Sequence, residues 1–221
     1  KMAAIYLIRH GQASFGAANY DQLSNVGEQQ AAHLGQYLQA SDVQFDAIYS
    51  GTLTRQRDTA SIAAKQFGKP VMHHIDARFN ELDNAGHYSQ LAPELAKIDP
   101  FVAEKLASGI ESSKDYQKVL QRVFAYWQSL KTCEGTATWA HYKSEVRAAV
   151  ADIMNHEGAG KTIAVFTSGG TIATIVAEVL GVSDDMVYQF YEPVINCSIT
   201  QCLYSGSRIS LSSYNDHSYL L

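Results

Sequence analysis

The sequence has no long apolar run and no cluster of positive charge. Its 221 residues contain no apolar stretch approaching the roughly 18 residues of a membrane helix, and the hydrophobic run near the N-terminus reaches Arg9 too soon for a secretory signal. The 17 Lys and Arg residues are outnumbered by 22 Asp and Glu, giving a net charge of −5, which argues against a general nucleic-acid surface. We therefore expect a cytoplasmic protein without membrane or nucleic-acid partners.

Cysteine is scarce, and neither an internal repeat nor a linker divides the chain. The three cysteines are odd in number, and Cys197 and Cys202 lie five apart on an expected strand, where side chains alternate between faces. With Cys133 they are expected to be reduced, half-buried thiols. Because 46% of the residues are hydrophobic and 18% charged, one substantial core is the natural expectation. We expect a single domain over residues 1–221, with helices at about 89–157 that cap and flank a sheet.

What the sequence does contain is an apolar strand that runs straight into charged residues. Ile5-Tyr6-Leu7-Ile8 is typical of a strand buried on both faces, and Arg9-His10-Gly11-Gln12 follows it. Ligand sites in open α/β sheets lie at the carboxyl ends of such strands. An arginine suits phosphate or carboxylate, and a neutral histidine can act as nucleophile, base or ligand. On these residues alone, a strand that simply ends in a solvated loop is an equal alternative.

Leu7-Ile8-Arg9-His10-Gly11 resembles the Arg-His-Gly signature that opens members of the histidine phosphatase superfamily, which includes the cofactor-dependent phosphoglycerate mutases. The resemblance spans essentially the whole chain. Leu23–Ala31 is similar to the first helix of the family, and the residues independently predict a helix there, with Ser24 as its N-cap and an apolar stripe along one face.

The second landmark is a pair of arginines at the start of a helix expected at 52–67, after a strand at 45–50. Arg55 and Arg57 are two residues apart, about 200° around a helix, so both cannot face one pocket. Ser50–Ala60 resembles the second signature of the family, an arginine four residues before Thr-Ala. The resemblance implies that Arg55 binds phosphate, and it leaves Arg57 in solvent.

Two further segments complete the resemblance. Arg78–Asp83 is similar to the family segment that carries an acidic residue into the pocket, and Glu81 takes that position. The strand expected at 162–166 ends in Thr167-Ser168-Gly169-Gly170 before a helix at 171–180, an arrangement typical of anion sites. Family members usually carry a second histidine immediately before this Gly-Gly pair, where this chain has Ser168.

The serine weakens the expected catalyst. A serine hydroxyl is shorter than an imidazole and uncharged, and losing one preorganised oxyanion donor typically costs about 2.7 to 4 kcal/mol of barrier. The amides at Gly169 and Gly170 could compensate in part, or a histidine such as His87 or His217 could reach the site; the sequence leaves these alternatives open. Gln12, His87 and Tyr88 are further candidates to line the substrate pocket.

The expected fold is α/β, a three-layer α/β/α sandwich of the phosphoglycerate mutase type with a mostly parallel sheet. A hairpin of strands at 194–203 and 209–214 is expected to form its antiparallel edge.

The expected function is hydrolysis of a small-molecule or peptide-borne phosphomonoester through a phosphohistidine on His10. By the resemblance, Arg9 and Arg55 hold the phosphoryl oxygens, Glu81 serves as acid and then base, and neither a metal nor a cofactor is needed because the arginines supply the positive field. One alternative is phosphotransfer of the phosphoglycerate mutase type, although Leu82-Asp83 follows Glu81 where mutases resemble one another in other residues. The other is a non-catalytic protein that binds a phosphorylated ligand.

Overall fold

The computed structural model describes residues 2–221 and contains a six-stranded mixed sheet in the order β3-β2-β4-β1-β5-β6. The strands are β1 (Ala3–Arg9), β2 (Ala47–Ser50), β3 (His73–Ile75), β4 (Thr162–Thr167), β5 (Ile199–Ser205) and β6 (Arg208–Asp216). The first four are parallel, whereas β5 pairs antiparallel with β1, and β6 antiparallel with β5. The predicted mostly parallel sheet with an antiparallel edge is confirmed.

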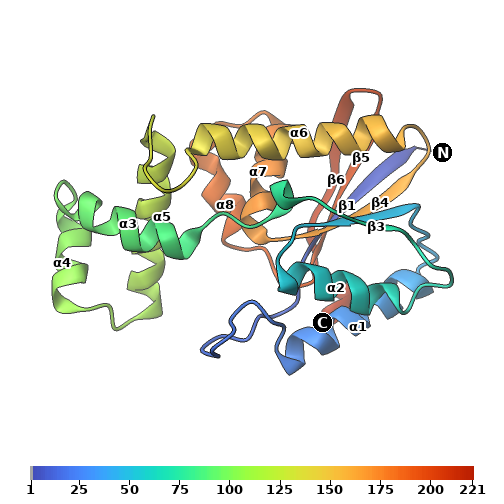
Figure 1. Ribbon diagram of the computed structural model, residues 1–221, viewed down its shortest axis with the longest axis horizontal. Helices are drawn as coiled ribbons and strands as arrows, with labels where there is room; N and C mark the ends of the chain where they lie inside the picture. The colour runs from blue at the N-terminus through green and yellow to red at the C-terminus, as the bar shows by residue number, and fades with distance from the viewer. Residues whose placement is uncertain (1) are drawn as a thin grey trace.

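Helices cover both faces of the sheet. They are α1 (Asn25–Ala40), α2 (Thr54–Ala64), α3 (Asn84–Ala96), α4 (Pro100–Ser108), α5 (Ser113–Ser129), α6 (Trp139–Glu157), α7 (Gly169–Leu180) and α8 (Val187–Tyr191), with short 3-10 turns η1 (Ala77–Phe79), η2 (Asp184–Met186) and η3 (Ser218–Leu220). Figure 1 shows α1 and α2 on one face and α6, α7 and α8 on the other. The predicted three-layer sandwich is therefore confirmed.

Successive side chains of β1 point to opposite faces of the sheet and pack into two different cores. Leu7 packs in the layer under α6 and α7, and Ile8 packs under α1 and α2. Both side chains are essentially inaccessible to solvent, as expected of a strand buried on both faces. A central strand held this firmly fixes the position of the residues that follow it, which are Arg9 and His10.

The loop after β1 is seated closely on the first turn of α1. Ser24 is the N-cap, as predicted, and its hydroxyl accepts a hydrogen bond from the Gly27 amide at 3.0 Å. A Cβ at Gly27 would overlap the carbonyl oxygen of Gln12, and one at Gly11 would overlap the carbonyl of Gly27. Glycine at both positions thus allows the two backbones to touch.

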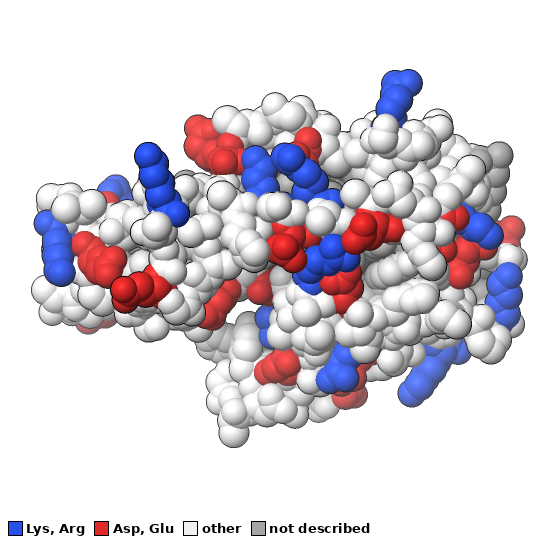
Figure 2. Space-filling model, turned by 45° about the horizontal axis from the view of Figure 1, so that its top comes forward, with Lys and Arg blue, Asp and Glu red and all other residues white. Residues whose placement is uncertain are grey.

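Helices α3, α4 and α5 form a lobe beyond the end of the sheet, whereas α6 runs along it (Figure 1). The core of the lobe includes Leu91, Val102, Val119 and Trp127, and it continues into α7 through Ala173 and Ala177. The space-filling view is notched between this lobe and the body of the molecule, and on that face Lys and Arg alternate with Asp and Glu (Figure 2). Within residues 2–221, no helix has both the length and the apolar character needed to cross a bilayer.

The strand predicted at 194–203 begins only at Ile199. All three cysteines are free thiols, as predicted, but the predicted half-burial is wrong for Cys197 and Cys202. Cys197 lies in a tight turn with φ +61°, and its amide donates to the Arg9 carbonyl at 2.9 Å, which closes off the end of β1. Cys197 and Cys202 are both fully buried, not half-buried, and only Cys133 is partly exposed. The apolar alternation suggested a strand, but the chain turns here to bring Asn196 under His10.

Candidate active site

Two neighbouring parallel strands end at the same edge of the sheet and bring His10 and Ser168 together. Arg9, the last residue of β1, pairs with Thr167, the last residue of β4. The His10 amide continues the ladder by donating to the Thr167 carbonyl at 3.0 Å. His10 and Ser168 therefore follow side by side at the carboxyl edge, where sites in α/β sheets form.

The His10 ring is held in one tautomer and kept neutral. Its Nδ1 lies 2.7 Å from the Gly11 carbonyl, which can only accept, so Nδ1 carries the proton and Nε2 has the free lone pair. Burial, with the charges of Arg9 and Arg55, lowers the pKa of His10 to about 3. The Asn196 amide donates to the His10 carbonyl at 3.0 Å and fixes the backbone. His10 thus presents an unprotonated nitrogen at neutral pH.

Arg55 lies directly against that nitrogen. Its Nε donates to His10 Nε2 at 3.3 Å, and its Nη1 forms an ion pair with Asp21 at 2.9 Å. Asp21 also accepts from the Thr54 amide at 2.9 Å; these bonds and the Arg55 charge outweigh its partial burial and lower the pKa of the carboxyl. Arg57 is exposed, as predicted. The ring of Tyr20 lies 5.7 Å from the Arg55 guanidinium on its outer side.

Arg9 approaches the site from the opposite side. Its Nη1 donates to the Val194 carbonyl, whereas its Nε is buried and has no hydrogen-bond partner among residues 2–221. The Nε lies beside Gly169, at 3.8 Å from the place a Cβ would occupy. Leaving a buried charged donor unpaired is costly, so a site that keeps one is prepared for an acceptor.

Glu81 is held by one amide at the start of α7, by the amide of the residue after it and by a tyrosine hydroxyl. Its carboxylate accepts from the Gly170 amide at 3.2 Å, the Leu82 amide at 3.1 Å and the Tyr191 hydroxyl at 3.2 Å. Burial nevertheless raises the pKa of Glu81 above its usual value, with the Gly170 amide and the Arg9 charge opposing it. A Cβ at Gly170 would overlap the carboxylate. The Gly170 amide, one of the two proposed to replace the missing histidine, is thus engaged by Glu81.

The place beside Ser168 is filled by Gln56, which the sequence did not single out. Ser168 is fully buried, and its hydroxyl oxygen accepts from Gln56 Nε2 at 2.9 Å. Neither histidine suggested for this place reaches it. The His87 ring packs 4.1 Å from that of Trp127, and His217 Nδ1 donates to the Asn215 carbonyl at 2.8 Å.

The three predicted pocket residues lie in different surroundings. His87 is only 3% exposed inside the lobe, where the ring of Trp127 covers it, so its side chain offers little surface to a ligand. Gln12 is exposed on the loop after β1, where its side-chain oxygen accepts from Ser24 at 2.9 Å. Tyr88 is half-buried on α3, with its ring 5.6 Å from that of Tyr116. For all three residues, a role in the pocket stays a prediction.

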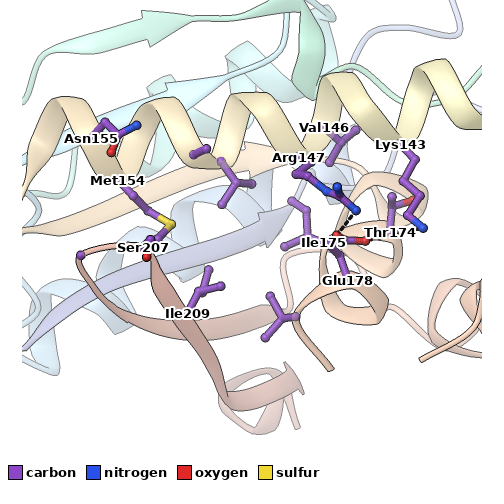
Figure 3. A pocket seen from close by; sticks show the side chains of 14 residues that line it. Lys143, Val146, Arg147, Met154, Asn155, Thr174, Ile175, Glu178, Ser207 and Ile209 are labelled. Atoms are coloured by element: carbon purple, nitrogen blue, oxygen red, sulfur yellow. Dashed lines mark ion pairs between the residues drawn. The ribbon is translucent and has the colours of Figure 1, made fainter. Parts of the chain in front are cut away.

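A separate cavity of about 310 Å³ lies between α6, α7 and the β5–β6 hairpin (Figure 3). Its floor is apolar, with Val146, Met154 and Ile175, and the Arg147–Glu178 ion pair stands at its rim. None of the predicted site residues lines it. Within residues 2–221, no three His, Cys, Asp or Glu side chains are grouped so that they could hold a metal ion.

Comparison with known proteins identifies the family of this chain. The sequence model of the histidine phosphatase superfamily, branch 1, matches residues 5–217. The chain belongs to this superfamily. It is 24% identical to the 2,3-bisphosphoglycerate-dependent phosphoglycerate mutase of Caulobacter vibrioides, over 84% of this chain and 84% of that protein.

Solved structures of histidine phosphatase relatives share the fold at low identity. A phosphoserine phosphatase mutant from Entamoeba histolytica in complex with phosphoserine has a TM-score of 0.69 and 22% identity, covering 100% of both chains. A phosphoglycerate mutase from Bacillus anthracis has a TM-score of 0.71 and 18% identity, covering 100% of this chain and 96% of that one. The alpha-ribazole phosphatase from Shigella flexneri has a TM-score of 0.66 and 17% identity, covering 96% of each. The fold is that of phosphoglycerate mutase-like proteins.

Proposed function

We propose that this histidine phosphatase superfamily member hydrolyses a phosphomonoester, from a small molecule or a peptide, through a phosphohistidine on His10. The observation that carries the proposal is the state of the His10 ring. Its Nδ1 proton is committed to the Gly11 carbonyl, and its Nε2 lone pair faces Arg55. A neutral, oriented imidazole beside a guanidinium is what in-line attack on a phosphoryl dianion requires.

In the first step, Nε2 of His10 forms a bond to phosphorus while the phosphorus–oxygen ester bond breaks. Arg55 Nε, which donates to His10 Nε2 beforehand, turns to a phosphoryl oxygen and so frees the lone pair, and the unpaired Nε of Arg9 donates to another phosphoryl oxygen. The leaving alkoxide takes the proton of Glu81, whose raised pKa favours the protonated acid. The products of this step are the free alcohol and phosphohistidine.

In the second step, water attacks the phosphorus of phosphohistidine and the phosphorus–nitrogen bond breaks. Glu81, now a carboxylate, accepts a proton from the water, which restores the acid. The imidazole leaves as the neutral ring with its proton still on Nδ1, so the tautomer required for the next cycle is already present. Inorganic phosphate is the second product.

The proposal is tested by turnover and by trapping the intermediate. The wild-type protein is expected to release p-nitrophenol from p-nitrophenyl phosphate and, when quenched during turnover, to carry a phosphoryl group that is stable to base and labile to acid. Peptide mapping is expected to place this group on His10. A protein with neither turnover nor label would contradict the proposal.

The acid–base groups predict that kcat/KM increases as the pH falls from about 8 to about 5. The pKa of His10, about 3, keeps the nucleophile unprotonated over this range. The raised pKa of Glu81 keeps the general acid protonated to a higher pH than a free glutamate, and its contribution is lost as the pH rises through that pKa. Initial rates with an alkyl phosphate, whose alkoxide must be protonated as it leaves, check this across the range, and a profile that falls steadily from pH 7 to pH 5 would contradict it.

Stability is expected to limit the same experiment at its acidic end. Between about pH 6.5 and 3 the unfolded chain binds a proton at His10 that the folded chain does not bind, so the free energy of unfolding decreases as the pH falls. The raised pKa of Glu81 acts in the opposite direction, because the folded state binds that proton more tightly. Circular dichroism at each pH separates loss of rate from unfolding.

Phosphotransfer on phosphoglycerate is the second candidate, and the mutases among the sequence relatives favour it. A mutase of this type must return the phosphoryl group to a second hydroxyl of its substrate faster than water takes it. Incubation with 3-phosphoglycerate distinguishes the two reactions, because isomerisation gives 2-phosphoglycerate and hydrolysis gives glycerate and phosphate. We expect release of phosphate to dominate.

A binding protein without turnover is the third candidate, and it is suggested by Ser168. Ser168→His alone has no room, because the Gln56 amide lies 2.9 Å from the serine oxygen and both residues are fully buried. We expect the double variant Ser168→His with Gln56→Ala to hydrolyse p-nitrophenyl phosphate about tenfold to a hundredfold faster than wild type. Equal and negligible rates in both proteins, with tight binding of the intact ester, would indicate a binding protein.

A further inference from the structure

We infer that Gln56 is a positioning residue that turns the hydroxyl proton of Ser168 toward the phosphoryl group, so that the two side chains together provide the donor for which most relatives would use a second histidine. This inference rests on the proposed function. It concerns how one oxyanion donor is built, not whether His10 is the nucleophile.

The orientation of the Gln56 amide follows from its partners. Its Nε2 lies 3.0 Å from the Phe79 carbonyl, which can only accept, so the nitrogen and not the oxygen must face Phe79. The same nitrogen has a second proton and lies 2.9 Å from Ser168 Oγ. Both protons of the Gln56 amide therefore have an acceptor, and in the hydrogen bond between Gln56 and Ser168 the serine hydroxyl oxygen is the acceptor.

That assignment fixes the role of the serine proton. A hydroxyl has one proton and two lone pairs, and here one lone pair is used by Gln56. Within residues 2–221, the Ser168 hydroxyl donates no hydrogen bond, and the side chain does not cap α7 although Ser168 is its N-cap. The Ser168 hydroxyl can therefore donate its proton to a bound ligand while it accepts from Gln56.

The position of Ser168 identifies the acceptor. Ser168 follows Thr167, whose carbonyl accepts the His10 amide, and Gly169 on its other side lies next to the unpaired Nε of Arg9. We therefore infer that the acceptor is a phosphoryl oxygen on His10, because Ser168 and His10 begin neighbouring segments of the sheet edge and Arg9 Nε lies next to Gly169. Because Ser168 and Gln56 are both fully buried, water does not compete for the hydrogen bond between them, which fixes the orientation of the serine hydroxyl.

A double-mutant cycle tests the pair. Ser168→Ala removes the donor and is expected to lower kcat for p-nitrophenyl phosphate about a hundredfold, with a small change in KM. Gln56→Met keeps the size of the side chain but loses the amide, and is expected to lower kcat about tenfold. If Gln56 acts through Ser168, Gln56→Met has less than a twofold effect in the Ser168→Ala background.

A matched control separates positioning from general support. Gln128 also donates its amide to a backbone carbonyl, that of Asp184, at 2.8 Å, but it lies on α5 away from His10. Gln128→Met is expected to leave kcat unchanged. If Gln56→Met does not fold, Gln56→Asn serves instead, because the shorter side chain keeps the amide but does not reach Ser168.

The affinity for orthovanadate, measured by thermal shift, tests the contribution of Gln56 and Ser168 without requiring turnover, because the bound oxyanion needs the same donors. Each of the two single variants is expected to weaken vanadate binding, and the double variant no more than Ser168→Ala does. Equal losses from Gln56→Met in both backgrounds, or a Ser168→Ala protein with wild-type kcat and vanadate affinity, overturns the inference. Failure of the proposed function is distinct: there the wild type itself has no turnover and no label on His10.

Discussion

Replacing His10 by alanine is expected to abolish phosphomonoester hydrolysis while leaving the protein folded and able to bind phosphate. The rate with p-nitrophenyl phosphate should fall by at least about 10⁴-fold, because no other group can form the covalent intermediate. Arg9 and Arg55 remain, so orthovanadate should still bind. Removing the ring also frees Arg55 Nε, which donates to His10 Nε2 in the wild-type protein. Steady-state rates and acid-labile labelling measure the effect.

The matched control is His33→Ala. His33 is exposed on α1 and contacts the ring of Tyr219 edge-on at 5.4 Å, so its loss removes an imidazole that makes one aromatic contact outside the site. Its rate should equal that of wild type. If His10→Ala retained a tenth of the activity, or if the acid-labile label persisted in it, the nucleophile would be another residue and the proposed function would be wrong.

The parts of the molecule that the sequence predicts well are those fixed by local pattern. The apolar run Ile5–Ile8 could only be a central strand, and Ser24 had the capping chemistry of a helix start. Helix geometry predicts that Arg55 and Arg57 cannot both face one pocket, the resemblance to the family selects Arg55, and the structure leaves Arg57 in solvent. Each of these inferences uses residues that are neighbours in the chain.

The residues that sequence reasoning missed act across long separations. Gln56 contacts Ser168 across 112 positions, and Tyr191 contacts Glu81 across 110. Asp21 lies in a polar loop, where nothing in its neighbours indicates that its carboxylate will hold Arg55. A buried glutamine followed by charged residues in a helix has no periodic signal. Contacts of this kind are decided by how elements pack, which a one-dimensional pattern does not contain.

At the turn at 194–198, by contrast, the local sequence pattern predicts a strand that the structure does not contain. Its residues alternate as a strand does, but the preceding helix α8 and the bonds from Cys197 to Arg9 and from Asn196 to His10 bend the chain. Local propensity for a strand loses here to contacts that assemble the site. The departure from the predicted strand therefore coincides with the candidate active site.

Glu81→Gln is expected to affect substrates according to their leaving group. For an alkyl phosphate, whose alkoxide must be protonated as it leaves, kcat should fall by about 10² to 10⁴-fold. For p-nitrophenyl phosphate, whose phenolate leaves without a proton, the first step should be nearly unchanged. The second step still lacks the base that activates water. Rapid mixing should therefore show a burst of p-nitrophenol followed by slow turnover, with phosphohistidine accumulating.

The glutamine is a conservative probe of this role because it can still accept from the Gly170 amide and from Tyr191. Glu157→Gln is the matched control, because Glu157 likewise accepts a hydrogen bond from a tyrosine, Tyr49, at 2.9 Å. Glu157 is the last residue of α6 and takes no part in the site, so the rates of this variant should equal those of wild type. If Glu81→Gln slowed both substrates equally without a burst, Glu81 would be supporting the site through its bonds to α7. A leaving-group dependence, by contrast, arises only from a proton delivered to the departing oxygen, which ties the raised pKa of this buried carboxyl to the chemical step.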